Sequence, residues 1–256
     1  MKGDYHIHTF FSPCAEATMS PDRIVEAAIA AGCAEVGLTD HPYHDGLARH
    51  HQALNHARER LAPAGVRIWI GAELEVVAMG ELIIPPSRLP LADYLIAAPS
   101  HYDLVGAPPV RDLADPLEWA DRLLTDLENV CGSGARAVAH PLYVQEIVKQ
   151  GPAGRRCAPL AAILAEIRPK RLDHILDRFA EEHIALEISP RLAAHPDFER
   201  FMEEWYRRAH RRGVKFMTGS DSHRPHTVGR LGPAEDFIRR LGLSPDDFWH
   251  PSPARP

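Results

Sequence analysis

The sequence has few cysteines, no long apolar run and no excess of positive charge. Its four cysteines form no Cys-x-x-Cys pair, which indicates reduced thiols and a cytoplasmic protein rather than a disulfide framework. No run of about 18 apolar residues is present, so no membrane-spanning helix is expected. The start of the chain, from Lys2 to His6, lacks the apolar segment of a signal peptide. The net charge of −6 argues against a protein that binds long nucleic acids.

What the sequence does have is enough apolar content for one substantial core, and many histidines. With 256 residues, 45% of them hydrophobic, the chain is predicted to fold as a single domain over residues 1–256, with a frayed tail at 251–256. The 16 histidines outnumber tryptophan and tyrosine together.

Short apolar runs alternate with helical patterns along the whole chain. Strands are expected at Asp4–Thr9, Glu35–Thr39, Arg67–Val77, Tyr94–Ala98, Ala135–His140, Ile184–Ser189 and Lys215–Gly219. Helices are expected from Ser20-Pro21 to Gly32 and at Leu47–Leu61, Pro116–Val130, Pro159–Ile167, Arg171–His183, Pro196–Arg212 and Pro233–Leu241. This alternation predicts an α/β fold of parallel strands, best satisfied by a distorted seven-stranded TIM-like (β/α)7 barrel. A doubly wound open sheet is the alternative.

Metal-binding side chains gather at the carboxyl ends of these strands. In the first strand His6 and His8 are two residues apart and therefore project from one face. Most later strands also contain or run into such residues, namely His41, Glu73, His101, His140, Glu187, Asp221 and His223. Because these ends open on one rim of a parallel barrel, the pattern predicts a metal centre at that rim.

The residue types constrain the metal. Imidazole and carboxylate groups suit Zn, Mn or Fe better than Ca or Mg. The number of ligands exceeds what one tetrahedral ion uses, so two or three divalent ions are expected. A carboxylate can bridge two ions where an imidazole cannot, and Glu73 is the best placed to do so. Ions about 3.5–4 Å apart can share a hydroxide and clamp the oxygens of an in-line displacement.

The candidate ligands lie in six short segments, which are His6-Ile7-His8-Thr9, Thr39-Asp40-His41, Glu73, His101, His140 and Gly219-Ser220-Asp221-Ser222-His223. Together these segments resemble the motif series of the PHP (polymerase and histidinol phosphatase) family. The resemblance extends roughly from Gly3 to Leu241. It implies a distorted seven-stranded barrel with up to three Zn, Mn or Fe ions. It also implies a first ion at His6, His8, Glu73 and Asp221, a second at Glu73, His101 and His140, and a third at His41 and His223.

Cys14 stands where many members of that family carry a further histidine. A thiolate is a good zinc ligand, so Cys14 could complete the third site. The alternative is that Cys14 is a small loop residue and that the third site is weak or empty.

Substrate-binding residues are expected among arginines that follow the strands, because the guanidinium group matches phosphate oxygens. The candidates are Arg191, Arg224, Arg155 and Arg156; alternatively, these are solvated surface residues. His226 is a candidate proton donor for the leaving group or a plain loop residue. Asp40 is a candidate to orient a histidine or accept a proton. Glu75 and Glu187 are candidates to support the metal ligands or to play structural roles.

Taken together, these features predict a metal-dependent phosphoesterase. By resemblance, a phosphomonoesterase of the histidinol-phosphatase type is expected, acting on a small phosphorylated substrate in histidine biosynthesis. Three alternatives remain: a phosphodiesterase or exonuclease on nucleotides, a hydrolase of carbon–nitrogen bonds, and a non-catalytic PHP module stabilised by metal. The sequence does not determine the metal, the natural substrate or the oligomeric state.

Overall fold

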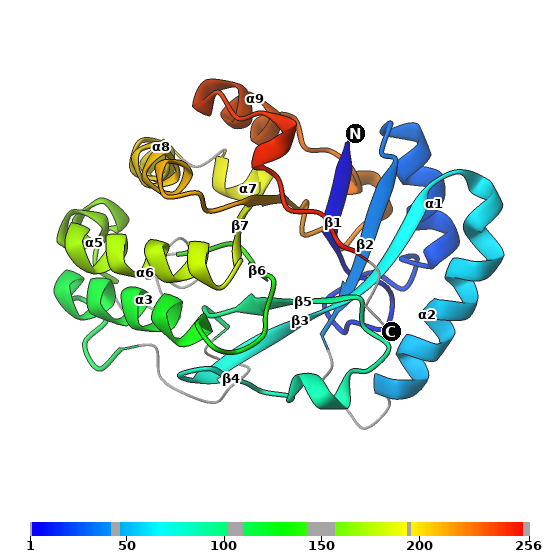
Figure 1. Ribbon diagram of the computed structural model, residues 1–256, viewed down its shortest axis with the longest axis horizontal. Coiled ribbons are helices and arrows are strands. Elements are labelled where there is room, and N and C mark those ends of the chain that lie inside the picture. Colours follow the sequence, from blue (N-terminus) through cyan, green and yellow to red (C-terminus); the bar gives the residue numbers. More distant parts are fainter. Residues whose placement is uncertain (1, 42–46, 102–109, 143–156, 194–195, 253–256) are drawn as a thin grey trace.

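Seven parallel strands, adjacent in sequence order, form the centre of the computed structural model, which describes all residues except 1, 42–46, 102–109, 143–156, 194–195 and 253–256 (Figure 1). The strands are β1 (Gly3–Ile7), β2 (Glu35–Asp40), β3 (Arg67–Ala78), β5 (Tyr94–Ala98), β6 (Ala137–Val138), β7 (Ala185–Ile188) and β8 (Phe216–Thr218). Each pairs in parallel with the next. All seven predicted strands are present, with ends that differ by up to two residues.

The first and last strands approach each other and nearly close the sheet into a barrel. Ile7 forms a parallel bridge with Ser222, just beyond β8. The amide of His8 donates to the Ser222 carbonyl (3.0 Å), and the Thr218 hydroxyl donates to the Gly3 carbonyl (2.7 Å). The predicted distorted (β/α)7 barrel is thus confirmed, and the open-sheet alternative is wrong.

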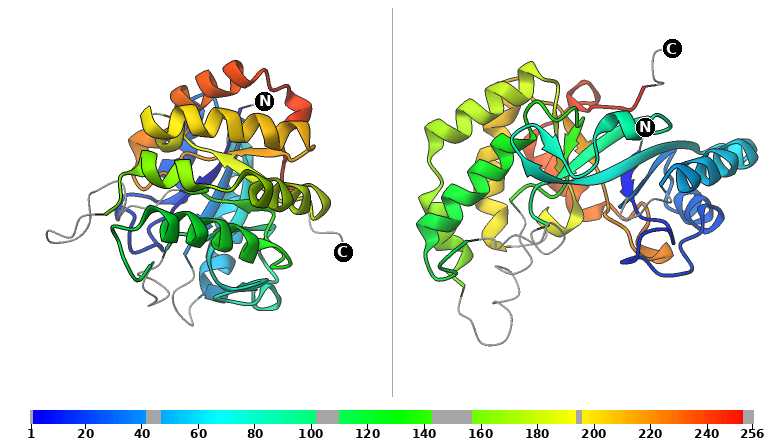
Figure 2. Two further views of the ribbon diagram at one scale, coloured as in Figure 1. Left: turned by 90° about the vertical axis from the view of Figure 1, so that its left-hand side faces the viewer. Right: turned by 90° about the horizontal axis from the view of Figure 1, so that it is seen from below.

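Helices cover the outside of the barrel (Figures 1 and 2). They are α1 (Pro21–Ala30), α2 (Leu47–Leu61), α3 (Pro116–Val130), α5 (Leu160–Glu166), α6 (Pro169–Glu181), α7 (Pro190–Ala193), α8 (Pro196–Arg211) and α9 (Gly232–Leu241). Helix α1 begins as predicted, with the Ser20 side chain accepting from the Arg23 amide (3.3 Å). The two-residue strand β4 (Glu81–Leu82) and the single turn α7 were not predicted, because both are too short to show a periodic pattern.

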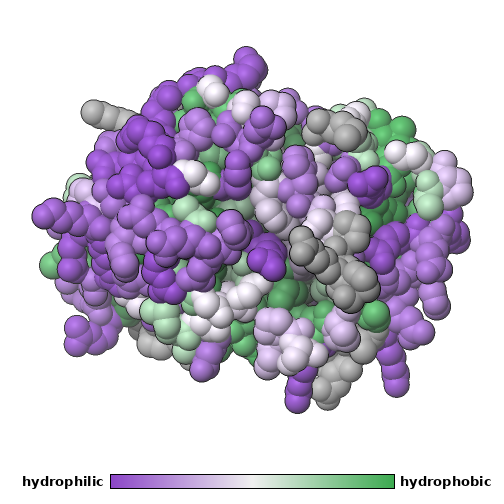
Figure 3. Space-filling view, viewed as in Figure 1, coloured by the Kyte–Doolittle hydropathy of each residue, from purple (hydrophilic) through white to green (hydrophobic). Residues whose placement is uncertain are grey.

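Apolar side chains fill the barrel interior below its carboxyl-end rim. They form a buried cluster of Tyr5, Trp69, Tyr94, Ile96, Ala137, Ala139, Ala185 and Met217. Outward-facing residues of the same strands pack instead under the helices, whose outer surface is largely hydrophilic over α5, α6 and α8 (Figure 3). Within the described part of the chain, each helix is too short or too polar to cross a membrane.

An irregularity in β1 determines where His6 points. Between the pairs Asp4–Val36 and Ile7–Leu38, β1 contains one residue more than β2. Tyr5 therefore belongs to the interior cluster, and its neighbour His6 also faces the interior. Ile7 turns outward into the cluster beneath α1 and α2.

Candidate metal centre

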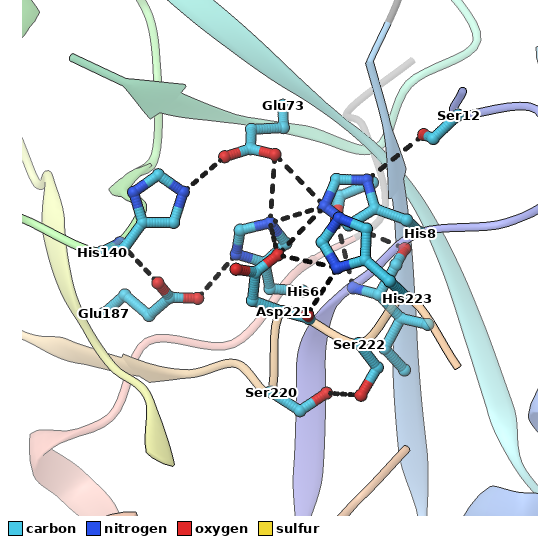
Figure 4. Close-up of polar contacts among 12 residues, drawn as sticks. His6, His8, Ser12, Glu73, His140, Glu187, Ser220, Asp221, Ser222 and His223 are labelled. Carbon is cyan, nitrogen blue, oxygen red and sulfur yellow. Dashed lines mark hydrogen bonds and ion pairs between the residues drawn. The ribbon is translucent and has the colours of Figure 1, made fainter. Parts of the chain in front are cut away.

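Glu73 is the central residue of the rim. It is 1% exposed, and its Oε2 lies 3.2 Å from Nε2 of His6, 3.2 Å from Nε2 of His8 and 3.1 Å from Nε2 of His41. Its other oxygen, Oε1, lies 2.8 Å from Nε2 of His140 and 3.9 Å from Nε2 of His101. The two oxygens of one carboxylate thus face two different groups of histidines, the arrangement that a bridging ligand requires (Figure 4).

Asp221 closes the cluster on the side of β1. Its Oδ1 lies 3.3 Å from Nε2 of His8 and 3.6 Å from Nε2 of His6. His223, two residues after Asp221, stacks on His8 with ring centroids 4.4 Å apart. Asp221 and His140 both have left-handed backbones, with φ of 52° and 30°. Such conformations are costly for residues other than glycine and concentrate at functional sites.

His6 and His8 each have a further polar partner at Nδ1, on the side of the ring that faces away from Glu73. Nδ1 of His6 lies 2.7 Å from Glu187 Oε1, and Nδ1 of His8 lies 3.2 Å from the Ser12 hydroxyl. A proton held on Nδ1 leaves Nε2 as the atom that can bind a metal. Glu187 also accepts from the His140 amide (2.5 Å), so this buried carboxylate supports two candidate ligands.

The donor set fits divalent transition metals. Glu73 Oε2 is buried and accepts no hydrogen bond from any residue that the structure describes. Nε2 of His6 and Nε2 of His8 are 3.2 Å apart, close to the roughly 3.3 Å edge of a tetrahedron with metal–nitrogen bonds of about 2.0–2.1 Å. Among the residues that the structure describes, four groups of side chains could hold a metal ion: His6–His8–Asp221, His6–Glu73–His140, His8–Cys14–His41 and His41–Glu75–His101.

Opposite charges dominate the centre when metal is absent. Burial alone would lower the pKa of His8, but the contacts with Asp221 and Glu73 outweigh burial and raise this pKa to about 9. Burial also opposes ionisation of Glu73, yet His41 and His6 hold its pKa well below the ordinary value. A metal that binds here must therefore displace protons from imidazolium groups.

The Asp40 carboxylate supports the loop after β1. It accepts from the Thr9 amide (2.7 Å), the Thr9 hydroxyl (2.7 Å) and the Ser12 hydroxyl (2.6 Å). Through Ser12 it is connected to His8, consistent with the interpretation that Asp40 orients a histidine. Ser12 was missed by sequence reasoning, because nothing in its local sequence distinguishes it from other loop serines.

Cys14 lies beside the candidate third site. Its sulfur belongs to one potential metal-binding group with His8 and His41. Burial and the negative charge of Glu73 raise the pKa of the thiol to about 12. A nearby cation is therefore required to produce the thiolate that would serve as a ligand. Its role as a ligand stays a prediction.

The predicted substrate-binding arginines differ in position. Nη1 of Arg191, on α7, lies 3.1 Å from Asp221 Oδ2, so Arg191 reaches the centre from the solvent side. Nε of Arg224 instead lies 3.2 Å from Glu16 Oε1, and its side chain is 61% exposed. Arg155 and Arg156 lie outside the described residues. His226 is exposed on a turn after β8, and its role as a proton donor stays a prediction.

Active sites of parallel α/β barrels lie at the carboxyl ends of the strands, and the histidine- and carboxylate-rich centre of this chain lies at that rim. The chain belongs to the PHP domain family, whose model matches residues 4–191, most of its length. Asp221 and His223 lie beyond that match, and their position in the centre comes from the structure.

One solved structure shares the fold. A histidinol phosphate phosphatase from Lactococcus lactis, solved with zinc, L-histidinol and phosphate, has 22% sequence identity and a TM-score of 0.68; the match covers 95% of this chain and 94% of that chain. An N-isopropylammelide isopropylaminohydrolase from Burkholderia multivorans has 16% identity and a TM-score of 0.49, covering 96% of this chain and 69% of that chain. No curated protein sequence matches the chain.

Proposed function

We propose that the protein is a metal-dependent phosphomonoesterase that removes phosphate from L-histidinol phosphate or a similar small monoester. The observation that carries the proposal is the position of Glu73, whose two oxygens face separate histidine groups. Membership of the PHP domain family and the fold shared with the Lactococcus phosphatase support it. A single domain, a cytoplasmic location and a role in histidine biosynthesis are parts of the same proposal.

His6, His8, Glu73 and Asp221 would hold the first of two or three Zn, Mn or Fe ions. The second would be held by Glu73, His101 and His140, and the third by His41 and His223, with Cys14 as a possible further ligand. When bound, such ions supply the positive charge that stabilises a reacting phosphoryl group.

The protein's own groups bind and orient the substrate around that centre. Arg191 is 41% exposed and points at Asp221, so its guanidinium can also bind a phosphate oxygen that enters from solvent. Asp221 in turn holds the Arg191 side chain at the rim and limits its freedom before substrate binds. Arg224 is a second candidate for phosphate binding and His226 for protonation of the leaving oxygen, both as the sequence predicts.

Phosphate release tests this function. The protein would be loaded with Mn²⁺ or Zn²⁺ and incubated with L-histidinol phosphate, beside Asp221→Ala and the surface control Arg239→Ala, whose arginine pairs with Asp236 on α9. We expect release by the parent and by Arg239→Ala, and none by Asp221→Ala. Release from diesters alone would indicate a phosphodiesterase, and release of an amine without phosphate would indicate cleavage of carbon–nitrogen bonds. Metal binding without any turnover would indicate a non-catalytic module.

A further inference from the structure

We propose that Glu75 is a positioning residue shared by two of the candidate metal sites, and that it couples ion binding at His41 to ion binding at His101. Glu75 Oε1 lies 3.4 Å from Nδ1 of His41 and 3.3 Å from Nδ1 of His101. The two histidines come from different segments, one after β2 and the other after β5. A single carboxylate oxygen therefore supports both rings. This inference rests on metal binding by the cluster and is independent of the substrate.

Glu75 stands on rigid backbone, whereas its two partners lie beyond their strands. Strand β3 is the longest of the sheet and still pairs with β5 at the level of Glu75 and Ala98. On the other side, the Ile83 amide next to β4 donates to the Glu75 carbonyl (2.8 Å). His41 directly follows the last residue of β2, and His101 lies three residues after β5. The buried Glu75 side chain thus ties two loop histidines to a fixed strand.

In His41 and His101, the ring nitrogen away from Glu75 faces Glu73. Nε2 of His41 lies 3.1 Å from Glu73 Oε2, while Nε2 of His101 lies 3.9 Å from Glu73 Oε1. The two imidazoles therefore point at opposite oxygens of Glu73 and would serve different ions. Nδ1 of His101 is within hydrogen-bond distance of Glu75, and the negative charge of Glu75 also lies beside Nδ1 of His41. A carboxylate at Nδ1 favours a proton there and makes Nε2 the stronger ligand. A shift of the Glu75 carboxylate would change both rings at once.

Metal affinity tests the proposal without any need for activity. Zn²⁺ bound per chain would be measured against a graded series of chelator concentrations, and anomalous diffraction would show which site is occupied. In Glu75→Gln we expect the ions at His41 and His101 to weaken together by roughly 10- to 100-fold, because an orienting partner of metal ligands has been changed. The ion at His6, His8 and Asp221 should keep its affinity. Glu81→Gln, an exposed glutamate of β4, is the matched control and should bind all ions as the parent does.

Unchanged affinity in Glu75→Gln, or weakening of only one of the two ions, would overturn the proposal. Should that variant fail to fold, the comparison of His101→Ala with His140→Ala decides. Both remove a ligand next to Glu73 Oε1, and His101 is the one whose Nδ1 lies 3.3 Å from Glu75 Oε1. We expect His101→Ala to weaken the ion at His41 more than His140→Ala does. Equal effects would show that any coupling runs through Glu73 alone.

Discussion

Gly219 lies against the carboxylate of Glu187 so closely that no side chain fits between them. A Cβ at position 219 would stand 2.1 Å from Glu187 Oε1 and 2.6 Å from Cβ of His6. Glu187 Oε1 is the atom that contacts Nδ1 of His6. The absence of a side chain on Gly219 therefore allows the Glu187–His6 contact that orients a candidate metal ligand.

Gly219→Ala is expected to weaken metal binding because the added methyl group must displace Glu187, His6 or both. We expect metal affinity to fall roughly 10-fold or more, and stability to fall by about 1–3 kcal/mol from overpacking. Chelator competition and thermal unfolding measure the two effects. Gly232→Ala is the control, since a Cβ there meets no atom within 4 Å. Equal metal affinity in both variants would contradict the role assigned to Gly219.

Arg191→Ala is expected to impair binding of the phosphate ester. A hydrogen bond to a charged group contributes about 1.5–3 kcal/mol, so KM should rise roughly 10- to 100-fold. Arg191→Lys keeps the charge without the planar fork and should give an intermediate value. Steady-state kinetics of phosphate release provide the measurement, with Arg239→Ala as control. An unchanged KM in Arg191→Ala would show that Arg191 only pairs with Asp221.

Without metal, the protein should be less stable at pH 8.5 than at pH 6.5. The pKa of His8 is raised in the folded protein to about 9, above its ordinary value of 6.5. A histidine whose pKa is higher in the folded than in the unfolded protein stabilises the fold when it is protonated. This stabilisation is complete at a pH below the pKa of the unfolded protein, and it is lost as the pH rises through the pKa of the folded protein. Thermal unfolding in the presence of a chelator should show the decrease, and His8→Gln should reduce it. A transition temperature that rises over this range would contradict the charge assignment.

Cys14→Ala tests the third site. With Cys14 as a ligand, the variant should bind one ion fewer per chain at a limiting metal concentration, because the Cys14 sulfur lies within the His8–Cys14–His41 group. Cobalt loading gives a second measurement, since a thiolate ligand produces a charge-transfer absorption that the variant should lack. Full metal content and an unchanged spectrum would remove Cys14 from the ligands.

The barrel and the residues of its rim were predictable because they follow from short-range rules. The two-residue period of a strand places His6 and His8 on one face, and parallel strands bring Glu73, His140 and Asp221 to one edge. The structure confirms the strand order and brings these five side chains together.

Features that depend on contacts distant in sequence were not predictable. The extra residue in β1, which turns Tyr5 and His6 both inward, has no sequence signal of its own. The partner of His6, Glu187, lies 181 residues away, so no local pattern could pair them. The orientation of Asp40 was not predictable, because a sequence does not locate the end of a strand such as β2 to within one residue.

Anomalous diffraction from crystals loaded with Zn²⁺ is the most direct test of the proposed metal centre. The proposed bridging role of Glu73 predicts a separate ion within about 2.0–2.2 Å of each of its oxygens, with the two ions roughly 3.5–4 Å apart. A single ion bound to both oxygens, or no ion at Glu73, would contradict the proposed centre and the phosphatase chemistry that rests on it.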